Sequence, residues 1–432
     1  MMFFGSLLFT SFVLGASAVT ISSLRSRGIT YSTTPTPPSQ DPWYTVPANF
    51  ENTAPGTILR VRVAPGNIPS IIGNCSQAYH LLYRTTDARY RPSWAVTTLY
   101  VPLSPTNATS SGSTGDALLS YQFPYNSADV DSSPSYTWAA GVQSPDLPNA
   151  LGLGWYVNFP DFEGPLAAFP AGIQEGHAVL DSIRAVLSSG FGLSPSTRYA
   201  MWGYSGGSVS STWAAELQAA YAPELNFSGM AIGGIVPNVT NTFNLISGNF
   251  YAGLLPAGLL GITAQYPEAR EYLVSRLKIN GTYNATTFLK SLDIDFETGN
   301  ILYQYQDIFN YFIGGKADLE VPLIQDIFNA NGYQGYHGIP QMPTFVYKAI
   351  HDELSPVEDS DALVDRYCSV RANILYQRNT VGSHLDEDSN GDARAFEWLK
   401  TVLNGSYGSQ YSTEGCTIQN VTVGVWNATL LV

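Results

Sequence analysis

The chain has 432 residues, of which 44% are hydrophobic and 13% aromatic, enough to fill one large domain or two to three average ones. Only 12% of the residues are charged, and the formal net charge is −14. A surface with this balance repels nucleic acid and anionic membranes, so we expect neither as a partner and favour a neutral, apolar small substrate.

The N-terminus is typical of a secretory leader. Residues 1–18 hold an apolar run followed by small residues at Ala16–Ala18, which predicts cleavage after Ala18. The alternative is a membrane anchor, but the run is shorter than the ~20 apolar residues that a spanning helix needs. We therefore predict a secreted, extracellular protein without stable membrane insertion. Residues 19–47 are expected to form an extended N-terminal arm, because Ser32–Pro47 is rich in Pro, Thr and Ser.

Acceptor motifs for N-glycosylation and the cysteines agree with export. Nine N-x-S/T motifs predict glycosylation, although a chain rich in Ser and Thr also produces some by chance. They lie at Asn74, Asn107, Asn226, Asn238, Asn280, Asn284, Asn404, Asn420 and Asn427.

The three cysteines, Cys75, Cys368 and Cys416, allow three pairings. We favour a Cys368–Cys416 disulfide, whose loop closure would contribute about 4 kcal/mol, with Cys75 free. No CxxC or HExxH spacing occurs, so no metal site is predicted.

Residues 48–236 read as the first part of an α/β core. Alternating apolar residues predict a hairpin of strands at 78–84 and 94–101, and short apolar runs predict buried strands at 117–121, 155–159, 198–202 and 229–236. Apolar residues at three- and four-residue spacing predict helices at 172–188 and 208–222. Strands that alternate with helices indicate a mostly parallel sheet.

One serine lies between glycines at the end of a predicted strand. The segment Gly203–Gly207 (GYSGG) separates the strand at 198–202 from the helix at 208–222. Strand, G-x-S-x-G and helix form the nucleophile elbow of α/β-hydrolases, in which a tight turn exposes the serine hydroxyl. Ser205 is therefore the candidate nucleophile, and the backbone N–H of Gly206 is the first candidate oxyanion donor.

The alternation stops between residues 237 and 336. Helical patterns occur at 268–279, 285–292 and 318–329, and no convincing strand is found. We interpret this segment as a helical cap or lid over the active site rather than an independent second domain, because the sheet resumes at 343–347. Residues 337–432 then form the second part of the core, which carries the catalytic acid and histidine.

Chain order selects the partners of the serine. In α/β-hydrolases the acid and then the histidine follow the nucleophile. Asp352 comes just after the strand at 344–350 and is the leading acid, with Glu353 second. His384 is the histidine beyond this acid and is the candidate base, with His351 as the fallback. The alternative is that His384 is a solvated loop residue.

These stretches resemble the fungal secretory lipases of the lipase A type. The matching segments are His80–Asp87, Ser120–Gln122, Pro160–Pro165, Leu180–Ala185, Gly203–Gly207 and Asp352–Glu353. The resemblance runs from about Pro42 to about Trp398 and implies an α/β-hydrolase fold with a large helical lid, a Ser205–Asp352–His384 triad and no cofactor.

Two positions depart from the pattern that the resemblance implies. The family carries a carboxyl side chain in the oxyanion loop, and the matching position here is Asn126. An amide donates a hydrogen bond at any pH, whereas a carboxyl donates only when protonated. A family cysteine near Ser132 is missing, so its first disulfide is expected to be absent. Both departures bear on substrate preference more than on the type of reaction.

The sequence thus predicts a carboxylic ester hydrolase, a lipase or esterase that acts on a neutral apolar ester, which can be presented at a lipid–water interface. One alternative keeps this chemistry but takes an acylated fungal secondary metabolite as substrate. Another is a non-catalytic binding protein with the hydrolase fold. The sequence does not indicate an oligomeric state.

Overall fold

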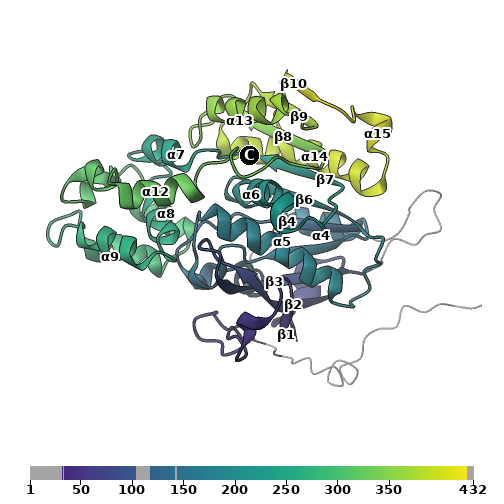
Figure 1. Cartoon of the computed structure of the whole chain (residues 1–432), viewed down its shortest axis with the longest axis horizontal. Helices are drawn as coiled ribbons and strands as arrows, with labels where there is room; N and C mark the ends of the chain where they lie inside the picture. The colour runs from purple at the N-terminus through teal and green to yellow at the C-terminus, as the bar shows by residue number, and fades with distance from the viewer. Residues whose placement is uncertain (1–31, 33, 104–116, 142–143, 426–432) are drawn as a thin grey trace, which may run out of the picture.

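The computed structural model describes residues 32, 34–103, 117–141 and 144–425. Ten strands of this part of the chain form one sheet, in the order β1-β2-β3-β5-β4-β6-β7-β8-β9-β10 (Figure 1). The strands are β1 (Ile58–Val63), β2 (Cys75–Thr86), β3 (Pro92–Pro102), β4 (Ala117–Gln122), β5 (Tyr156–Pro160), β6 (Arg198–Tyr204), β7 (Gly229–Gly233), β8 (Thr344–Ala349), β9 (Ile374–Asn379) and β10 (Cys416–Val421). The predicted leader lies outside the described residues.

The sheet is antiparallel at one edge and parallel over the rest. β1, β2, β3 and β5 pair antiparallel, and the pairs from β5 through β4 to β10 are parallel. The predicted hairpin is confirmed: β2 and β3 pair from Thr86 and Pro92 at the turn to Cys75 and Pro102. Asp87 closes that turn, since its Oδ1 accepts hydrogen bonds from the N–H groups of Arg89 and Arg91, each at 2.8 Å.

Helices cover both faces of the sheet. The larger ones in the core are α5 (Gly172–Ser188), α6 (Gly206–Tyr221), α13 (Val357–Ser369) and α14 (His384–Asn404), and shorter ones are α2 (Ile68–Ile72), α3 (Pro134–Ala140), α4 (Asp146–Gly152) and α15 (Tyr407–Gln410). Successive strand residues point to opposite faces. In β6, Tyr199 and Met201 join the core formed with α5 and α6, whereas Ala200 and Trp202 join the core formed with α4 and α14. Burial on both faces explains why β6 is a nearly continuous apolar run.

The segment between β7 and β8 is helical throughout its named elements. These are α7 (Val239–Ile246), α8 (Leu254–Ile262), α9 (Pro267–Ser275), α10 (Ala285–Phe288), α11 (Phe296–Tyr303) and α12 (Pro322–Asn331), with short 3-10 turns between some of them. Figure 1 shows α7, α8, α9 and α12 gathered at one side of the sheet. Helix α8 lacked an amphipathic signal in the sequence because all nine of its residues are buried. The helix predicted at 318–329 begins only at Pro322, a residue suited to the first turn of a helix.

The described part of the N-terminal arm packs against the sheet instead of extending from it. Tyr44 is 8% exposed, and its hydroxyl is 2.7 Å from Ser135 Oγ. The guanidinium of Arg62 in β1 lies 4.2 Å from the centroid of the Trp43 ring, a cation–π geometry. The prediction of an extended arm is therefore wrong for these residues, because the aromatic side chains give the arm a buried contact that the Pro and Ser content does not reveal.

The favoured cysteine pairing is present. A disulfide joins Cys368 in α13 to Cys416 in β10, and Cys75 is free and buried. Among the predicted glycosylation sites, Asn74, Asn226, Asn280, Asn404 and Asn420 are exposed, Asn238 and Asn284 are partly buried and cap helices, and Asn107 and Asn427 lie outside the described residues. Glycosylation itself stays a prediction.

Candidate active site

Ser205 occupies a sharp turn between β6 and α6. Its backbone has φ 51° and ψ −121°, a conformation that few non-glycine residues adopt, and α6 begins at the next residue. The neighbouring glycines permit this turn. A Cβ at Gly203 would lie 2.2 Å from Gly207 O, and a Cβ at Gly207 would lie 1.8 Å from Gln122 O in β4. The sequence pattern thus forms the strand–turn–helix arrangement that presents a serine hydroxyl.

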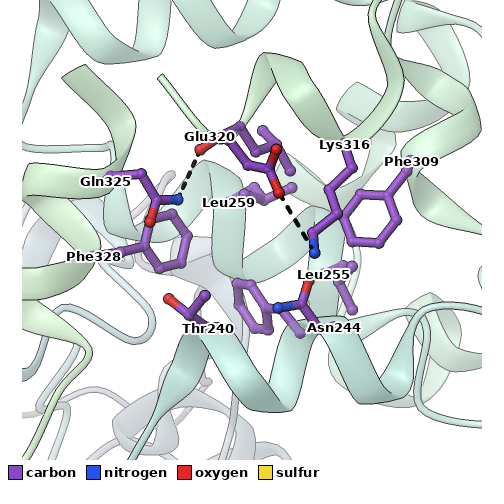
Figure 2. Close-up of a pocket in the computed structure, with 11 residues that line it drawn as sticks. Thr240, Asn244, Leu255, Leu259, Phe309, Lys316, Glu320, Gln325 and Phe328 are labelled. Carbon is purple, nitrogen blue, oxygen red and sulfur yellow. Dashed lines mark hydrogen bonds and ion pairs between the residues drawn. The ribbon is translucent and has the colours of Figure 1, made fainter. Parts of the chain in front are cut away.

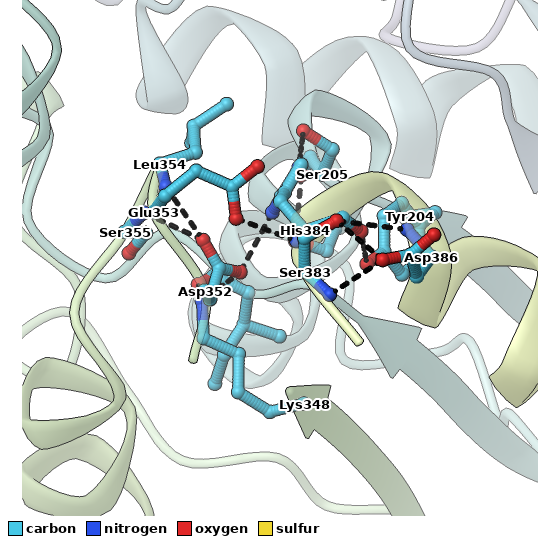
Figure 3. A network of polar contacts seen from close by, with 12 residues as sticks. Tyr204, Ser205, Lys348, Asp352, Glu353, Leu354, Ser355, Ser383, His384 and Asp386 are labelled. Carbon is cyan, nitrogen blue, oxygen red and sulfur yellow. Dashed lines mark hydrogen bonds and ion pairs between the residues drawn. The ribbon is translucent and has the colours of Figure 1, made fainter. Parts of the chain in front are cut away.

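The structure brings Ser205, His384 and Asp352 together from three separate segments (Figure 3). His384 Nε2 lies 2.9 Å from Ser205 Oγ, and His384 Nδ1 lies 2.7 Å from Asp352 Oδ2. His384 is 1% exposed and Asp352 is 7% exposed. These contacts form one continuous hydrogen-bonded chain from the carboxylate to the serine oxygen, in an environment with little water.

Asp352 is surrounded by donors. Its Oδ1 accepts hydrogen bonds from the backbone N–H groups of Leu354 and Ser355, both at 2.8 Å. Its Oδ2 accepts a third from the ammonium group of Lys348, at 2.7 Å. Burial by itself raises the pKa of Asp352, but the charges of Lys348 and His384 outweigh burial and hold the pKa below its ordinary value. The carboxylate is therefore ionised at the pH at which the histidine works.

Lys348 is a buried cation that the sequence analysis did not single out. It is 0% exposed and lies in β8, four residues before Asp352, where its Nζ also donates to Ile235 O at 3.0 Å. Burial lowers the pKa of Lys348, and the carboxylate of Asp352 opposes that shift. The signal in the sequence was a lysine within the apolar strand at 344–350, since a lysine is rarely buried unless it is paired.

The backbone of His384 is held by two further side chains. Glu353 Oε2 accepts a hydrogen bond from His384 N–H at 2.9 Å, and the hydroxyl of Tyr204 donates to His384 O. Glu353, the second-choice acid, thus contacts the main chain of the histidine and not its ring. His384 is the first residue of α14, and Ser383 and Asp386 form a capping box there. The alternative that His384 is a solvated loop residue is wrong, because this helix buries it.

The other histidines lie elsewhere. His351, the fallback base, is exposed. His80 and His177 are fully buried, at 0% exposure, and His337 has Nδ1 3.8 Å from Glu216 Oε2. In the described structure, the ring that contacts Ser205 Oγ is that of His384.

Asn126 lies against the residue that follows the serine. A Cβ added to Gly206 would be 1.9 Å from Asn126 Oδ1, so the two residues are in direct contact. Asn126 has φ 46°, in the left-handed region that asparagine tolerates. Its Oδ1 is buried and has no donor among the described residues. The loop after β4 therefore places the amide of Asn126 beside the residue that follows Ser205, and its role in the oxyanion hole stays a prediction.

A small cavity opens beside Ser205. Its volume is about 30 Å³, and its lining carries no charged side chain. The lining residues are Asn126, Phe169, Pro170, Ser205, Gly206, Val209, Val236, Val239, Thr242, Phe243, Leu254 and Leu354. Val239, Thr242, Phe243 and Leu254 come from α7 and α8, so the helical segment forms part of the wall next to the serine.

A second cavity lies within the helical segment and shares one wall with the first. Its volume is about 90 Å³, and Figure 2 shows apolar side chains such as Leu255, Leu259 and Phe328 around it. Lys316 and Glu320 lie in the same lining and form an ion pair at 3.6 Å. Phe243 lines both cavities, so the space beside Ser205 and the larger space within the helical segment meet at its side chain.

Two features are absent from the described residues. No cluster of three or more His, Cys, Asp or Glu side chains is arranged to hold a metal ion in the described ranges. Within the same ranges, no helix has both the length and the apolar character that crossing a membrane requires.

The chain is similar to known fungal ester hydrolases. A sequence model of the secretory lipase family matches residues 131–410. The trichothecene C-3 esterase of Fusarium sporotrichioides is 48% identical over 399 residues, which cover 90% of this chain and 89% of that protein. Lipase A of Arthroderma benhamiae is 36% identical over 395 residues, which cover 86% of this chain and 81% of that protein.

Solved structures show the same relationship. Candida antarctica lipase A in its closed state superposes with a TM-score of 0.77 at 28% identity, covering 86% of this chain and 87% of that one. The predicted α/β-hydrolase fold with a mostly parallel sheet is confirmed by this likeness. The chain belongs to the secretory lipase family and is a carboxylic ester hydrolase.

Proposed function

We propose that this hydrolase acts through Ser205 as nucleophile, His384 as general base and Asp352 as the carboxylate that orients the histidine. The observation that carries the proposal is the unbroken chain of contacts at 2.7 and 2.9 Å from Asp352 through His384 to Ser205 Oγ. Such a chain lets the histidine take the proton of the hydroxyl as the hydroxyl attacks. This arrangement favours an enzyme over the non-catalytic binding protein considered from the sequence.

The reaction then follows in two halves. Ser205 Oγ bonds to the ester carbonyl carbon while its proton moves to His384 Nε2, and the carbonyl oxygen becomes an oxyanion. The bond to the alcohol oxygen breaks, and His384 returns the proton to that oxygen. Water attacks the acyl-enzyme by the same route and releases the acid. Throughout, Asp352 stays ionised because Lys348 and two backbone N–H groups hold it.

The oxyanion is proposed to bind at the Gly206 N–H and the side-chain amide of Asn126. Gly206 is the first residue of α6, and the N–H groups at a helix N-terminus have no partner within the helix. Asn126 contacts Gly206 through Oδ1, and Nδ2 lies farther from Gly206, so donation by Nδ2 to the same oxygen requires the amide to turn when the substrate binds. Because neither donor titrates in the working range of the enzyme, stabilisation of the oxyanion is expected to persist at alkaline pH.

For the substrate, we propose an ester with a short acyl group and a bulky neutral alcohol. The cavity beside Ser205 has a volume of about 30 Å³ and a lining without charged side chains. A small neutral acyl group suits this space better than a long chain. Two relatives favour a trichothecene as the alcohol part: the trichothecene C-3 esterase of Fusarium sporotrichioides, and a probable trichothecene esterase of Stachybotrys chartarum that is 43% identical. We therefore favour an acylated trichothecene-like metabolite.

A second candidate function is lipid hydrolysis at a lipid–water interface. The cap exposes large apolar side chains at Leu245, Phe250 and Tyr305, which are 44%, 42% and 68% exposed. Exposed apolar patches are typical of surfaces that meet a membrane or another protein. In this case, Phe243 would have to move so that a long acyl chain reaches the cavity inside the cap.

The central test is the Ser205→Ala variant on p-nitrophenyl acetate, with Ser210→Ala in the same helix as the matched control. We expect kcat of Ser205→Ala to fall by about 10³–10⁶-fold with the fold intact, and Ser210→Ala to stay near wild type. Retained activity in Ser205→Ala would reject the assignment. A series of p-nitrophenyl esters of increasing acyl length then distinguishes the two candidate substrates. The highest kcat/KM on the acetate would support a short-acyl ester, and the highest kcat/KM on a long-chain ester would support a lipid.

We also propose secretion after removal of residues 1–18, with glycans on the exposed acceptor asparagines and with residues 237–336 as the cap. The secretory family supports the export, and Phe243 and Leu254 at the Ser205 cavity support the cap. N-terminal sequencing of the secreted protein should begin at Val19, and its mass should fall on treatment with an N-glycosidase. A retained leader or an unchanged mass would contradict these assignments.

A further inference from the structure

One carboxylate links the cap to the backbone of the proposed catalytic histidine. Tyr251, in the segment between α7 and α8, donates its hydroxyl to Glu353 Oε1 at 2.8 Å. The other oxygen of Glu353 accepts the backbone N–H of His384 at 2.9 Å. Asn249, two residues before Tyr251, donates to Glu353 O at 3.3 Å. Glu353 is thus bound on one side by the cap and on the other by the histidine.

Tyr251 also covers the imidazole directly. It is 2% exposed, and its ring lies 6.1 Å from the His384 ring at 78°, an edge-to-face arrangement. Burial and the neighbouring Glu353 raise the pKa of Tyr251, so its hydroxyl remains a donor at working pH. The described residues that line the cavity beside Ser205 do not include Tyr251 or Glu353. Neither residue is placed to bind the substrate's acyl group.

We propose that Tyr251 and Glu353 are positioning residues that fix His384 when the cap is closed over the site. The N–H of His384 is at the N-terminus of α14, where a carboxylate binds well because the first turn of a helix has free N–H groups and a positive dipole. Holding that N–H fixes the backbone from which the imidazole reaches Ser205. Because the other end of Glu353 is held by the cap, the ring is best aligned only while the cap is in place.

The alignment matters because proton transfer depends steeply on geometry, and a displacement of about 1 Å can cost about 10²-fold in rate. Glu353 is itself solvent-exposed, so its two hydrogen bonds are weaker than buried ones. We therefore expect a moderate loss, with kcat about tenfold lower in Glu353→Ala and in Tyr251→Phe and with KM nearly unchanged. This inference depends on the proposed role of His384.

A double-mutant cycle on p-nitrophenyl acetate tests the inference. Wild type, Tyr251→Phe, Glu353→Ala and the double variant are compared. Tyr303→Phe is the matched control for a buried, hydrogen-bonded cap tyrosine, and Glu358→Ala is the control for an exposed glutamate. We expect the double variant to be no slower than Glu353→Ala alone, because both changes break the same link. Glu353→Gln, which keeps a carbonyl acceptor for His384 N–H, should recover most of kcat.

Two outcomes would overturn the inference: wild-type kcat in Tyr251→Phe, or losses that multiply in the double variant. Thermal unfolding of each variant identifies a loss caused by misfolding, and Tyr251→Phe removes only one oxygen atom, so a folded variant is available. Measuring Ser205→Ala in parallel distinguishes a failure of the proposed function from a failure of the positioning role of Tyr251 and Glu353. Activity in Ser205→Ala would refute the proposed function. An inactive Ser205→Ala together with a Tyr251→Phe variant that keeps the wild-type kcat would refute only the role of the cap.

Discussion

Replacing Lys348 with methionine tests how a buried positive charge acts on the proposed triad. Lys348 Nζ and His384 Nδ1 each lie 2.7 Å from Asp352 Oδ2, so they are separated by no more than twice that distance. At about 5 Å and an effective dielectric constant of about 20, two positive charges repel by about 3 kcal/mol. The lysine charge also holds the pKa of Asp352 below its ordinary value.

The positive sign of the lysine charge determines the direction in which the pH profile of kcat/KM moves. Lys348 favours the ionised form of Asp352, so removing the lysine charge should raise the pKa of that carboxyl. In Lys348→Met we expect the pH below which kcat/KM falls to move upward, because a protonated Asp352 no longer accepts the hydrogen bond that orients His384. The assay is kcat/KM on p-nitrophenyl acetate across acidic and neutral pH. Lys316→Met, a cap lysine with a 48% exposed side chain, is the control. An acid limb that stays in place or moves to lower pH would refute the reasoning.

We also predict a change in the stability of Lys348→Met. Removing one partner of a buried ion pair costs about 3–5 kcal/mol. Lys348 and His384 hold the pKa of Asp352 below its ordinary value. The ionised carboxylate therefore stabilises the fold above about pH 4. This stabilisation is lost as the pH falls through the pKa that Asp352 has in the folded state. Urea unfolding should therefore show the largest gap between wild type and Lys348→Met at neutral pH and a smaller gap in acid. A gap independent of pH would instead indicate a packing defect.

Three further predictions follow from the site and the disulfide. Phe243→Ala should join the two cavities that meet at its side chain, and the preferred p-nitrophenyl ester should lengthen from acetate; an unchanged chain-length profile would contradict this role. Asn126→Ala should lower kcat by about 10²–10³-fold. Asn126→Asp should lose kcat at high pH, because an ionised carboxyl cannot donate a hydrogen bond. If the kcat–pH profiles of wild type and Asn126→Asp superimpose, the proposed donor role of Asn126 is wrong. Cys416→Ser opens a disulfide spanning 48 residues and should lower the free energy of unfolding in urea by about 4 kcal/mol, whereas a change below about 1 kcal/mol would show that the pairing of β9 with β10 already fixes this edge.

Local patterns were enough to predict most of the core. The helix at Gly172–Ser188 was predicted with the observed bounds, and the strands around Ser205 and Asp352 lie where their apolar runs indicated. Both types of signal are strong because a helix with one buried face and a strand buried on both sides each leave a periodic or continuous apolar pattern. The elements that the sequence did not reveal lack such a pattern. β10 is mostly exposed, and α8 is apolar on all sides.

Chain order also selected the three residues of the proposed triad, but the residues that support them could not be found in the same way. Glu353 and Tyr251 act through a contact between segments that are 102 residues apart in sequence. Lys348 lies four residues from Asp352 and left a signal as a lysine in an apolar strand, but a tyrosine among helices has no sequence signature that distinguishes a role at the site from simple packing. The role of Lys348 and of Tyr251 at the site depends on the carboxylate oxygen to which each side chain donates, which only the folded structure shows.

By itself the sequence determined the class of chemistry, because the elbow glycines, the order of serine, acid and histidine, and the apolar periodicity are local properties of the chain. Only the tertiary structure decided the size of the space beside Ser205, the position of Phe243 in the linings of two cavities, and the contacts that run from Tyr251 through Glu353 to His384. Those features arise where the helices after β7 fold back over the carboxyl ends of the strands. The distances across that contact are set by packing and not by neighbours in the chain.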